Sequence, residues 1–276
     1  MSTHTVQTAS TVEAGPAVLD LTQPIGRITI TVDPAATQAS VTVRTTAESG
    51  PVADAVRGTR IERSGRCLTV RVPEIPGLVV SGNTVISGGS VTLGDGNSVF
   101  NFRGGMSGVT FAGSGRIVVN GVDVTQAVRD GGGQDTAAEI ETTVTLPADS
   151  EVRLSTHSAA TTVSGHLACL DYGGTSGNLI ADQVGDLTLD LTSGSTRINR
   201  VTDRLDVVMT SGNLALAAYE GSSARVKLTS GNASIRATPA SRGRFAVSLT
   251  SGNVTITGAR HLDVNRRVTS GCLTVS

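Results

Sequence analysis

The sequence predicts an all-β protein whose C-terminal half is a parallel β-helix, also called a β-solenoid. A motif that begins Thr-Ser-Gly occurs six times, with copies that start at Thr175, Thr192, Thr210, Thr229, Thr250 and Thr269. This near-regular spacing of about 19 residues is typical of repeat architectures. The composition agrees, because 33 glycines permit frequent turns, while two Tyr, four Phe and no Trp leave a mainly aliphatic core.

The N-terminal quarter predicts a short tail followed by strands. Residues 1–15 are polar and show no pattern, which predicts a flexible tail. Residues 16–75 contain runs in which apolar and polar residues alternate, as they do in half-buried strands. We therefore expect a small N-terminal β-sheet part over residues 16–75, with one short helical turn between Val52 and Arg57.

The middle of the chain has a different texture. Residues 76–119 form a Gly-rich β segment whose short apolar triplets allow a narrow solenoid, a set of hairpins or a mobile excursion. Phe100, Phe102 and Phe111 are either core residues of this segment or a candidate partner patch. Residues 120–140 are polar and glycine-rich, which predicts a surface loop.

The repeats over residues 141–276 predict the β-solenoid itself. Apolar residues alternate on both sides of each Thr-Ser-Gly, so each unit should contribute two strands with one buried face. One unit cannot bury that face alone, but units stacked about 4.8 Å apart bury a continuous core. A divergent copy of the repeat is expected near Thr156.

The repeated turn is interpreted as a structural corner. Its glycines are expected to need positive φ angles, which a Cβ would penalise. Its asparagines should stack in register as a ladder, as in other stacked strands. The turn residues are Gly177, Gly194, Gly212, Gly231, Gly252 and Gly271, with Asn178, Asn213, Asn232 and Asn253.

Charge and chain signals exclude several classes of partner. A net charge of -1 and a pI of about 6.4 argue against nucleic acid and anionic membranes as partners. No signal peptide and no long apolar run are visible, so we expect a cytoplasmic protein without membrane insertion. Cys67, Cys169 and Cys272 are far apart in sequence, which favours reduced thiols over a disulfide framework.

No motif for catalysis, cofactor binding or metal binding occurs in the chain. Of the four histidines only His157 and His166 are close in sequence, and frequent serines make an apparent triad there a coincidence. Asp190 and Asp206 are expected on corresponding outward faces of two repeats, where they could mark a groove for a polysaccharide. The simpler interpretation of such carboxylates is an ordinary solvated surface.

The repeats, the opening GRITITVDP and the interior RIVVNGVDV resemble the bacterial putative-adhesin family of β-strand-repeat domains of unknown function, common in actinobacteria. The resemblance covers residues 18–276. It implies a parallel β-helix with a β-rich N-terminal part and no catalytic residues. The chain departs from the pattern at Ser195 and Cys272, which replace asparagine, and at Arg266, which replaces an apolar residue.

These observations predict a non-enzymatic β-solenoid scaffold or interaction protein. Solenoids usually carry a capping unit, and none is visible after Leu273, Thr274 and Val275. We therefore expect self-association through this candidate edge, as a closed dimer or a filament, or binding of another protein there. The alternative is a carbohydrate-binding or polysaccharide-acting β-helix, whose partner would be a glycan.

Overall fold

The computed structural model describes residues 5–75 and 139–276 in full, and six short strands between them by their backbone. The chain divides into two compact units: unit 1 comprises Met1–Glu74 and Ile140–Ser276, and unit 2 comprises Ile75–Glu139. The strands of unit 2 are β7 (Val79–Val80), β8 (Val85–Ile86), β9 (Val91–Leu93), β10 (Val109–Ala112), β11 (Arg116–Val119) and β12 (Val122–Asp123).

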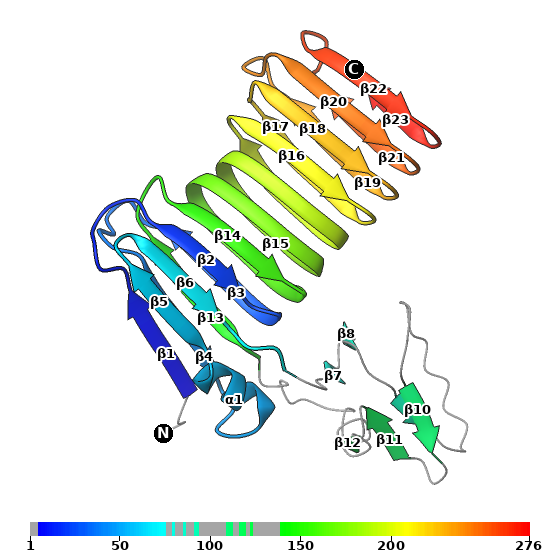
Figure 1. The fold of residues 1–276 in the computed structure, drawn as a ribbon. Helices are drawn as coiled ribbons and strands as arrows, with labels where there is room; N and C mark the ends of the chain where they lie inside the picture. The colour runs from blue at the N-terminus through cyan, green and yellow to red at the C-terminus, as the bar shows by residue number, and fades with distance from the viewer. Residues whose placement is uncertain are drawn as a thin grey trace. The chain divides into compact units, whose positions relative to one another are not determined.

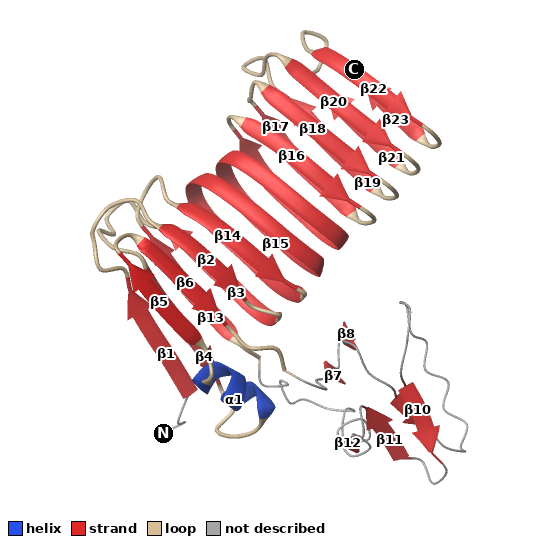
Figure 2. Cartoon of the chain, in the orientation of Figure 1, coloured by secondary structure: helices blue, strands red, loops and turns tan. Residues whose placement is uncertain are grey.

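Unit 1 is almost entirely β-structure with one short helix (Figure 2). Its elements are β1 (Thr5–Ser10), β2 (Val18–Thr22), β3 (Ile25–Val32), β4 (Ser40–Thr45), α1 (Pro51–Arg57), β5 (Arg60–Ser64), β6 (Cys67–Arg71), β13 (Glu141–Leu146), β14 (Glu151–Thr156), β15 (Ser158–Val201), β16 (Arg204–Met209), β17 (Asn213–Tyr219), β18 (Ser223–Leu228), β19 (Asn232–Ala237), β20 (Arg244–Leu249), β21 (Asn253–Thr257), β22 (Asp263–Val268) and β23 (Cys272–Val275).

Successive coils of unit 1 stack in parallel, which confirms the predicted β-solenoid (Figure 1). Each coil has a first arm before the Thr-Ser-Gly corner and a second arm after it. The first-arm strands β16, β18, β20 and β22 pair in that order, and the second-arm strands β17, β19, β21 and β23 pair likewise. The long strand β15 runs through two corners without a break.

The N-terminal strands belong to the same stack, so the predicted division between residues 16–75 and 141–276 is wrong. β2 pairs in parallel with β6 on one side and β14 on the other, and β3 does the same with β13 and β15. The coil formed by β2 and β3 therefore lies between two coils that come later in sequence. The alternation of apolar and polar residues predicts that these segments are strands, but it does not predict their order in the stack.

Residues 5–10 form strand β1, so the predicted flexible tail is wrong for them. β1 pairs antiparallel with β4, from Thr5 opposite Thr45 to Ser10 opposite Ser40. Its polar sequence TVQTAS is compatible with a strand because it lies at the margin of the sheet, where most of its side chains stay partly or fully exposed.

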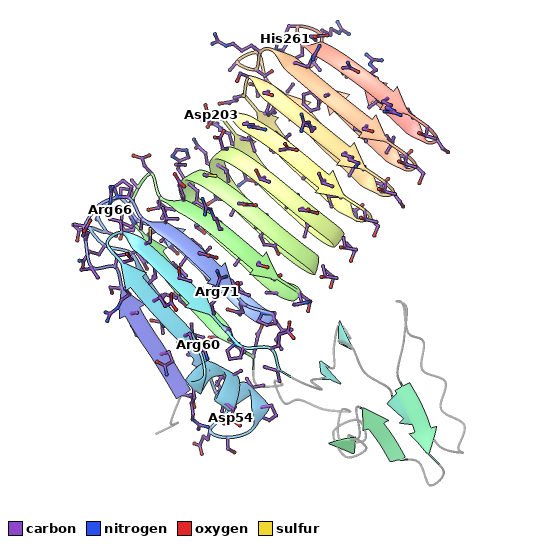
Figure 3. The ribbon with its side chains drawn as sticks, viewed as in Figure 1. Asp54, Arg60, Arg66, Arg71, Asp203 and His261 are labelled. Carbon is purple, nitrogen blue, oxygen red and sulfur yellow. The ribbon has the colours of Figure 1, made fainter. Side chains whose placement is uncertain are left out.

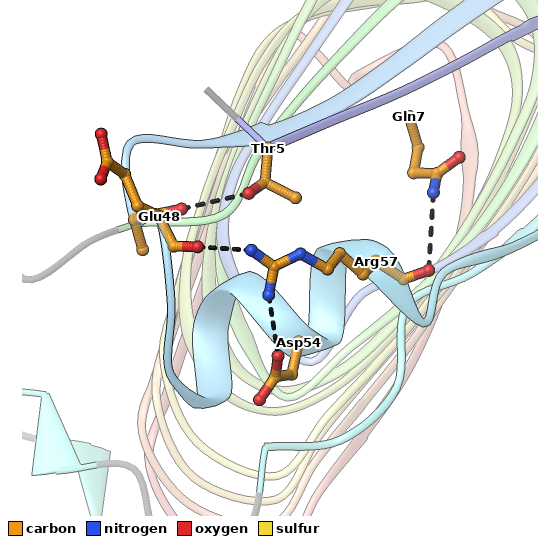
Figure 4. Close-up of polar contacts among 6 residues, drawn as sticks. Thr5, Gln7, Glu48, Asp54 and Arg57 are labelled. Atoms are coloured by element: carbon orange, nitrogen blue, oxygen red, sulfur yellow. Dashed lines mark hydrogen bonds and ion pairs between the residues drawn. The ribbon is translucent and has the colours of Figure 1, made fainter. Parts of the chain in front are cut away.

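The short helix predicted near Val52 is confirmed as α1. Its apolar residues Val52, Ala53, Ala55 and Val56 are buried. Arg57 links the helix to the loop before it, because its guanidinium donates to the carboxylate of Asp54 at 3.0 Å and to the backbone oxygen of Glu48. Viewed along the stack, α1 lies across the coil interior (Figure 4), so this end of the core is covered.

The core of unit 1 is the continuous row of inward side chains. Leu187, Leu189 and Leu191 are each 1% exposed, and their neighbours in the next coil are Leu205, Val207 and Met209. Tyr219 and Phe245 pack edge to face with ring centroids 5.5 Å apart. Burial of each such side chain contributes about 1.5–3 kcal/mol, so the stack is stabilised mainly through contacts between coils.

Unit 2 leaves and re-enters unit 1 at the corner of one coil. The backbone N–H of Val72 donates to the Thr22 oxygen at 2.9 Å, and that of Arg27 donates to the Ile140 oxygen at 2.9 Å. Both contacts flank the corner of the β2–β3 coil. Val72 and Ile140, the described residues of unit 1 on either side of this segment, therefore lie at the same corner of unit 1.

Within unit 2 the backbone forms two small sheets. β10 pairs antiparallel with β11, and β11 with β12, so residues 122–123 of the predicted surface loop form a strand. β7 and β8 form a separate hairpin. Phe100 and Phe102 lie outside the described residues, and only the backbone of Phe111 is described, in β10. The candidate partner patch therefore stays a prediction.

Candidate functional site

The Thr-Ser-Gly corners bring successive coils into close contact at their glycines. The φ angle is 135° at Gly194, 131° at Gly212 and 108° at Gly252. A Cβ on Gly252 would lie only 2.0 Å from the backbone oxygen of Gly231 in the previous coil. Both the backbone angle and the close stacking therefore require glycine. Gly231 and Gly271 behave in the same way.

Gly177 differs from the prediction, because its φ is not positive. A Cβ there would still lie 2.8 Å from the backbone oxygen of Ala159. The backbone N–H of Ser176 donates to the oxygen of His157 at 2.7 Å, so the corner at 157–159 stacks directly below this one. The divergent repeat expected near Thr156 is thereby confirmed.

The asparagine ladder forms in three coils. Asn232 donates to the side chain of Asn213 at 3.1 Å, and Asn253 donates to that of Asn232 at 3.2 Å. Asn178 is outside the ladder, because in the repeat Ser195 stands between it and Asn213. These two hydrogen bonds link the corners of three successive coils, which is a structural role.

A shallow groove follows this ladder on the outer face of the second arms. Besides the ladder it is lined by Ser195, Arg197, Ser234 and Thr255. No carboxylate lines it, so it has no pair of groups for acid and base catalysis. The groove can offer hydroxyls, amides and one guanidinium to a polar ligand.

Asp190 and Asp206 do not mark a joint groove. Asp206 lies opposite Thr188, while Asp190 lies opposite Val208, so the two carboxylates are displaced by two residues along their strands. Asp206 is also engaged by Arg204 at 3.5 Å and by Arg225 at 3.7 Å. The displacement arises because Asp190 is two residues before its Thr-Ser-Gly corner and Asp206 is four residues before its own. Asp190 is exposed and Asp206 is ion-paired.

The histidines and cysteines are dispersed in the described part of the chain. His157 and His166 lie at opposite ends of the segment of β15 that pairs with β3, and His261 contacts Ser241 at 3.1 Å near the last coil. The cysteines are free thiols, and burial, with Glu151 adding to it, raises the pKa of Cys169. Among the described residues no cluster of three metal-ligating side chains occurs.

Two tyrosines buried in the core, Tyr172 and Tyr219, have raised pKa values. Burial raises the pKa of Tyr219 to about 12, and the backbone of Ser223 opposes this rise only in part. Burial also raises the pKa of Tyr172, against a smaller lowering by the hydroxyls of Thr156 and Thr161. Both rings lie inside the stack, at most 1% exposed, so they have no access to a substrate.

The coil formed by β22 and β23 is the open end of the described stack (Figure 1). Leu273 and Val275 lie directly above Val254 and Ile256, which are 1% and 0% exposed. In this last coil the same positions are half-buried, and Val268 is 40% exposed. Beyond β22 and β23 no described strand pairs with their outer edges.

The sequence-predicted edge Leu273, Thr274 and Val275 therefore lies at an open end in the described chain. Leu273 and Val275 face the coil interior, whereas Thr274 faces outward and is exposed. Val264 and Val268 form the first-arm part of this surface and were not predicted, although both follow the same alternation of apolar and polar residues. Exposed charged residues lie on its β22 side, namely Arg260, Asp263, Arg266 and Arg267, and His261 lies at the preceding corner (Figure 3).

Comparisons with known proteins identify a family and a set of similar folds. The family model described as Toastrack DUF4097 matches residues 111–271. No curated protein sequence is significantly similar to the chain. No helix in the described residues is long and apolar enough to cross a membrane.

Three solved bacterial structures align with nearly the whole chain. A putative adhesin from Parabacteroides distasonis is 11% identical, with 98% of this chain and 97% of that chain covered and a TM-score of 0.44. A putative adhesin from Bacteroides fragilis is 10% identical, with 98% and 96% covered and a TM-score of 0.45. A putative cell adhesion protein from Clostridium sporogenes is 10% identical, with 99% and 98% covered and a TM-score of 0.41. The expected actinobacterial type gains no support from these organisms.

Proposed function

The chain belongs to the Toastrack DUF4097 family, and from that premise we propose that it is a scaffold without enzymatic activity that binds other proteins through its last coil. The observation that carries the proposal is the open β22–β23 coil. Its inward side chains Val264, Leu273 and Val275 are half-buried, whereas their counterparts one coil below are fully buried.

The last coil offers two kinds of unsatisfied interaction. The outer edges of β22 and β23 present backbone donors and acceptors that a further strand can pair with, a recognition mode known as strand addition. Each Å² of the half-exposed apolar side chains that a partner covers contributes about 25 cal/mol to the free energy of binding. A second copy of the chain is one partner that supplies both, which is the self-association expected from the sequence.

Selection of a random twelve-residue peptide library on the full chain tests this binding mode. We expect recovered peptides to slow hydrogen exchange in β22 and β23. Leu273→Ser should weaken their binding at least tenfold, because it removes an apolar side chain from the inward face without adding a charge. Thr274→Ser is the matched control, since it changes the outward face of the same strand.

Light scattering coupled to size exclusion tests the second copy as partner. Self-association through the last coil predicts a mass that rises with micromolar concentration in the wild type and in Thr274→Ser, but not in Leu273→Ser. A strictly monomeric wild type together with an empty peptide selection would refute the proposed function.

Glycan binding is the second candidate, and the groove along the asparagine ladder favours it. Hydroxyls and amides recur there once per coil, a spacing that suits a repetitive polar ligand. A glycan array probed with the wild type and with Asn232→Ala tests it: binding that the substitution weakens supports the groove, and a blank array rejects it.

A further inference from the structure

The last coil differs from the coils below it at one inward position. On the first arm, Leu189, Val207, Val226 and Val247 form one column of inward side chains. The next residue in this column is Arg266, which lies directly above Val247. Arg266 is exposed, and no described carboxylate is within ion-pair distance of it. A guanidinium thus stands at the open end, where the repeat otherwise has an aliphatic side chain.

The open end is also the basic end of the solenoid. Residues 220–276 contain two acidic residues, Glu220 and Asp263, and both lie near arginines, at 3.7 Å from Arg200 and 3.6 Å from Arg244. The basic residues of this segment are Arg225, Lys227, Arg236, Arg242, Arg244, Arg260, Arg266 and Arg267. Residues 141–219 have the opposite bias, with Asp and Glu in excess over Arg. The net charge of the whole chain is only -1, but acidic residues are in excess over residues 141–219 and basic residues over residues 220–276.

We infer that the partner of the last coil is an acidic extended segment of another protein, which adds as a strand to β22. This rests on the proposed function, since it names the partner of the same surface. The segment places apolar side chains over Val264 and Val268 and a carboxylate over Arg266. A second carboxylate, on its outer face, lies beside Arg267. In parallel pairing this requires the pattern apolar, any residue, acidic, acidic, apolar.

A second copy of this chain fits the last coil less well. End-to-end contact of two copies brings two basic ends together, which repulsion disfavours. None of the buried inward positions in the described coils carries a carboxylate that could pair with Arg266. Nucleic acid and membranes match the charge, but they cannot pair with the backbone edge of β22 or cover Val264.

The rival explanation is that Arg266 only protects the edge. Inward charges on edge strands discourage aggregation in many β-proteins. Such a protective charge would repel basic and neutral strands without attracting acidic ones. The two explanations therefore differ in the effect of partner charge on affinity.

Fluorescence anisotropy with three labelled twelve-residue peptides separates these explanations. The peptides share Thr and Ser flanks and a core Val-Thr-Glu-Glu-Val, in which the two Glu are replaced by Gln or by Lys in the second and third peptides. For the full wild-type chain we expect the Glu peptide to bind at least tenfold more tightly than the Lys peptide. Its affinity should fall as salt is raised, because the charges are partly exposed.

The variant Arg266→Glu should reverse the preference toward the Lys peptide. Arg236→Glu is the matched control: it makes the same charge change at an exposed, outward position of β19 and should preserve the order of affinities. Circular dichroism and thermal unfolding establish that both variants are folded.

Equal affinity of the Glu and Gln peptides, with slowed hydrogen exchange in β22, would overturn the acidic partner and leave the proposed function intact. Self-association that protects β22 and β23 would do the same, because it makes a second copy the occupant. If none of the three peptides binds, the acidic partner is rejected, and a wild type that is also monomeric and selects no library peptide rejects the proposed function with it.

Discussion

At the scale of single residues, the corners show how one glycine serves two purposes. Gly252 has a φ of 108°, and its α-carbon approaches the coil below so closely that a Cβ would contact the oxygen of Gly231. Gly173, in the straight part of β15, has neither constraint, because φ is not positive there and the nearest atom to a built Cβ is 4.0 Å away. The chain thus contains glycines that are required and glycines that are not.

Replacement of these two glycines by alanine should therefore have opposite effects. Gly252→Ala should lower the free energy of unfolding by about 2–5 kcal/mol, through a disfavoured φ and overpacking against the coil below. Gly173→Ala should be neutral or stabilising by up to about 1 kcal/mol, because it reduces the entropy of the unfolded chain. Urea unfolding of both variants measures the difference, and equal effects would contradict the assigned role of the corner.

Tyr219 should make unfolding depend on pH in the alkaline range. Its pKa in the fold is about 12, above the value of about 10 in an unfolded chain. The unfolded state therefore loses this proton first, so the stability that Tyr219 contributes is complete below pH 10 and falls between pH 10 and 12. The loss is at most about 1.4 kcal/mol per pH unit.

Tyr219→Phe removes the titrating hydroxyl and keeps the ring that packs on Phe245. Thermal unfolding measured from pH 9 to 11.5 should show a shallower decline in the variant than in the wild type. Tyr172 retains its own alkaline contribution in both proteins, since burial raises its pKa as well. Parallel curves would show that Tyr219 ionises normally in the fold.

At the scale of elements, the alternation of apolar and polar residues predicts which segments are strands but not the order in which the coils stack. The strands over residues 16–75 and the short helix were predictable, because alternating apolar residues and the Val52–Arg57 pattern are local signals. The position of the β2–β3 coil was not predictable, because its corner reads Gln23-Pro24 and lacks the Thr-Ser-Gly motif. Gln23 instead holds the corner, accepting from Thr142 at 2.5 Å and donating to Ile25 at 2.9 Å.

Because Val72 and Ile140 lie at the same corner of unit 1, we expect unit 1 to fold without unit 2. Replacing residues 75–139 by a short Gly-containing turn should leave a folded unit 1, because both ends of the excision flank the Gln23-Pro24 corner. We expect the β-sheet circular dichroism per residue to persist, with a cooperative thermal transition within a few degrees of that of the full chain. Noncooperative melting would show that unit 2 is needed for the fold of unit 1.

A longer excision of residues 75–146 is the control. It also removes β13, which pairs with both β3 and β4, and so exposes one edge of each of these strands and the buried side chains of Ile30 and Val41 beside Val144. This variant should aggregate or lose its cooperative transition.

At the scale of the whole molecule, the two ends of unit 1 are unequal. α1 and the antiparallel strands β1 and β5 cover one end, while β22 and β23 form the last coil at the other. The sequence predicted the stacked repeats because they follow from the periodicity of residues 141–276. The charge polarity and the isolation of Arg266 became interpretable only when the register placed that residue above Val247.

Because each coil contacts only its neighbours, stability should vary along the stack. Hydrogen exchange measured by mass spectrometry should be fastest in β22 and β23, which have one neighbouring coil each, and slower in β16 and β17, which have two.

The variant Arg266→Val gives the last coil the same residue that the three coils below it have in this column, namely Val207, Val226 and Val247. It should slow hydrogen exchange in β22 several-fold, because it extends the apolar column by one side chain. Arg236→Val, on the outward face of β19, should leave β22 unchanged. Uniform exchange along the stack would mean that unit 1 opens as a single unit, and the last coil would then be as rigid as the core.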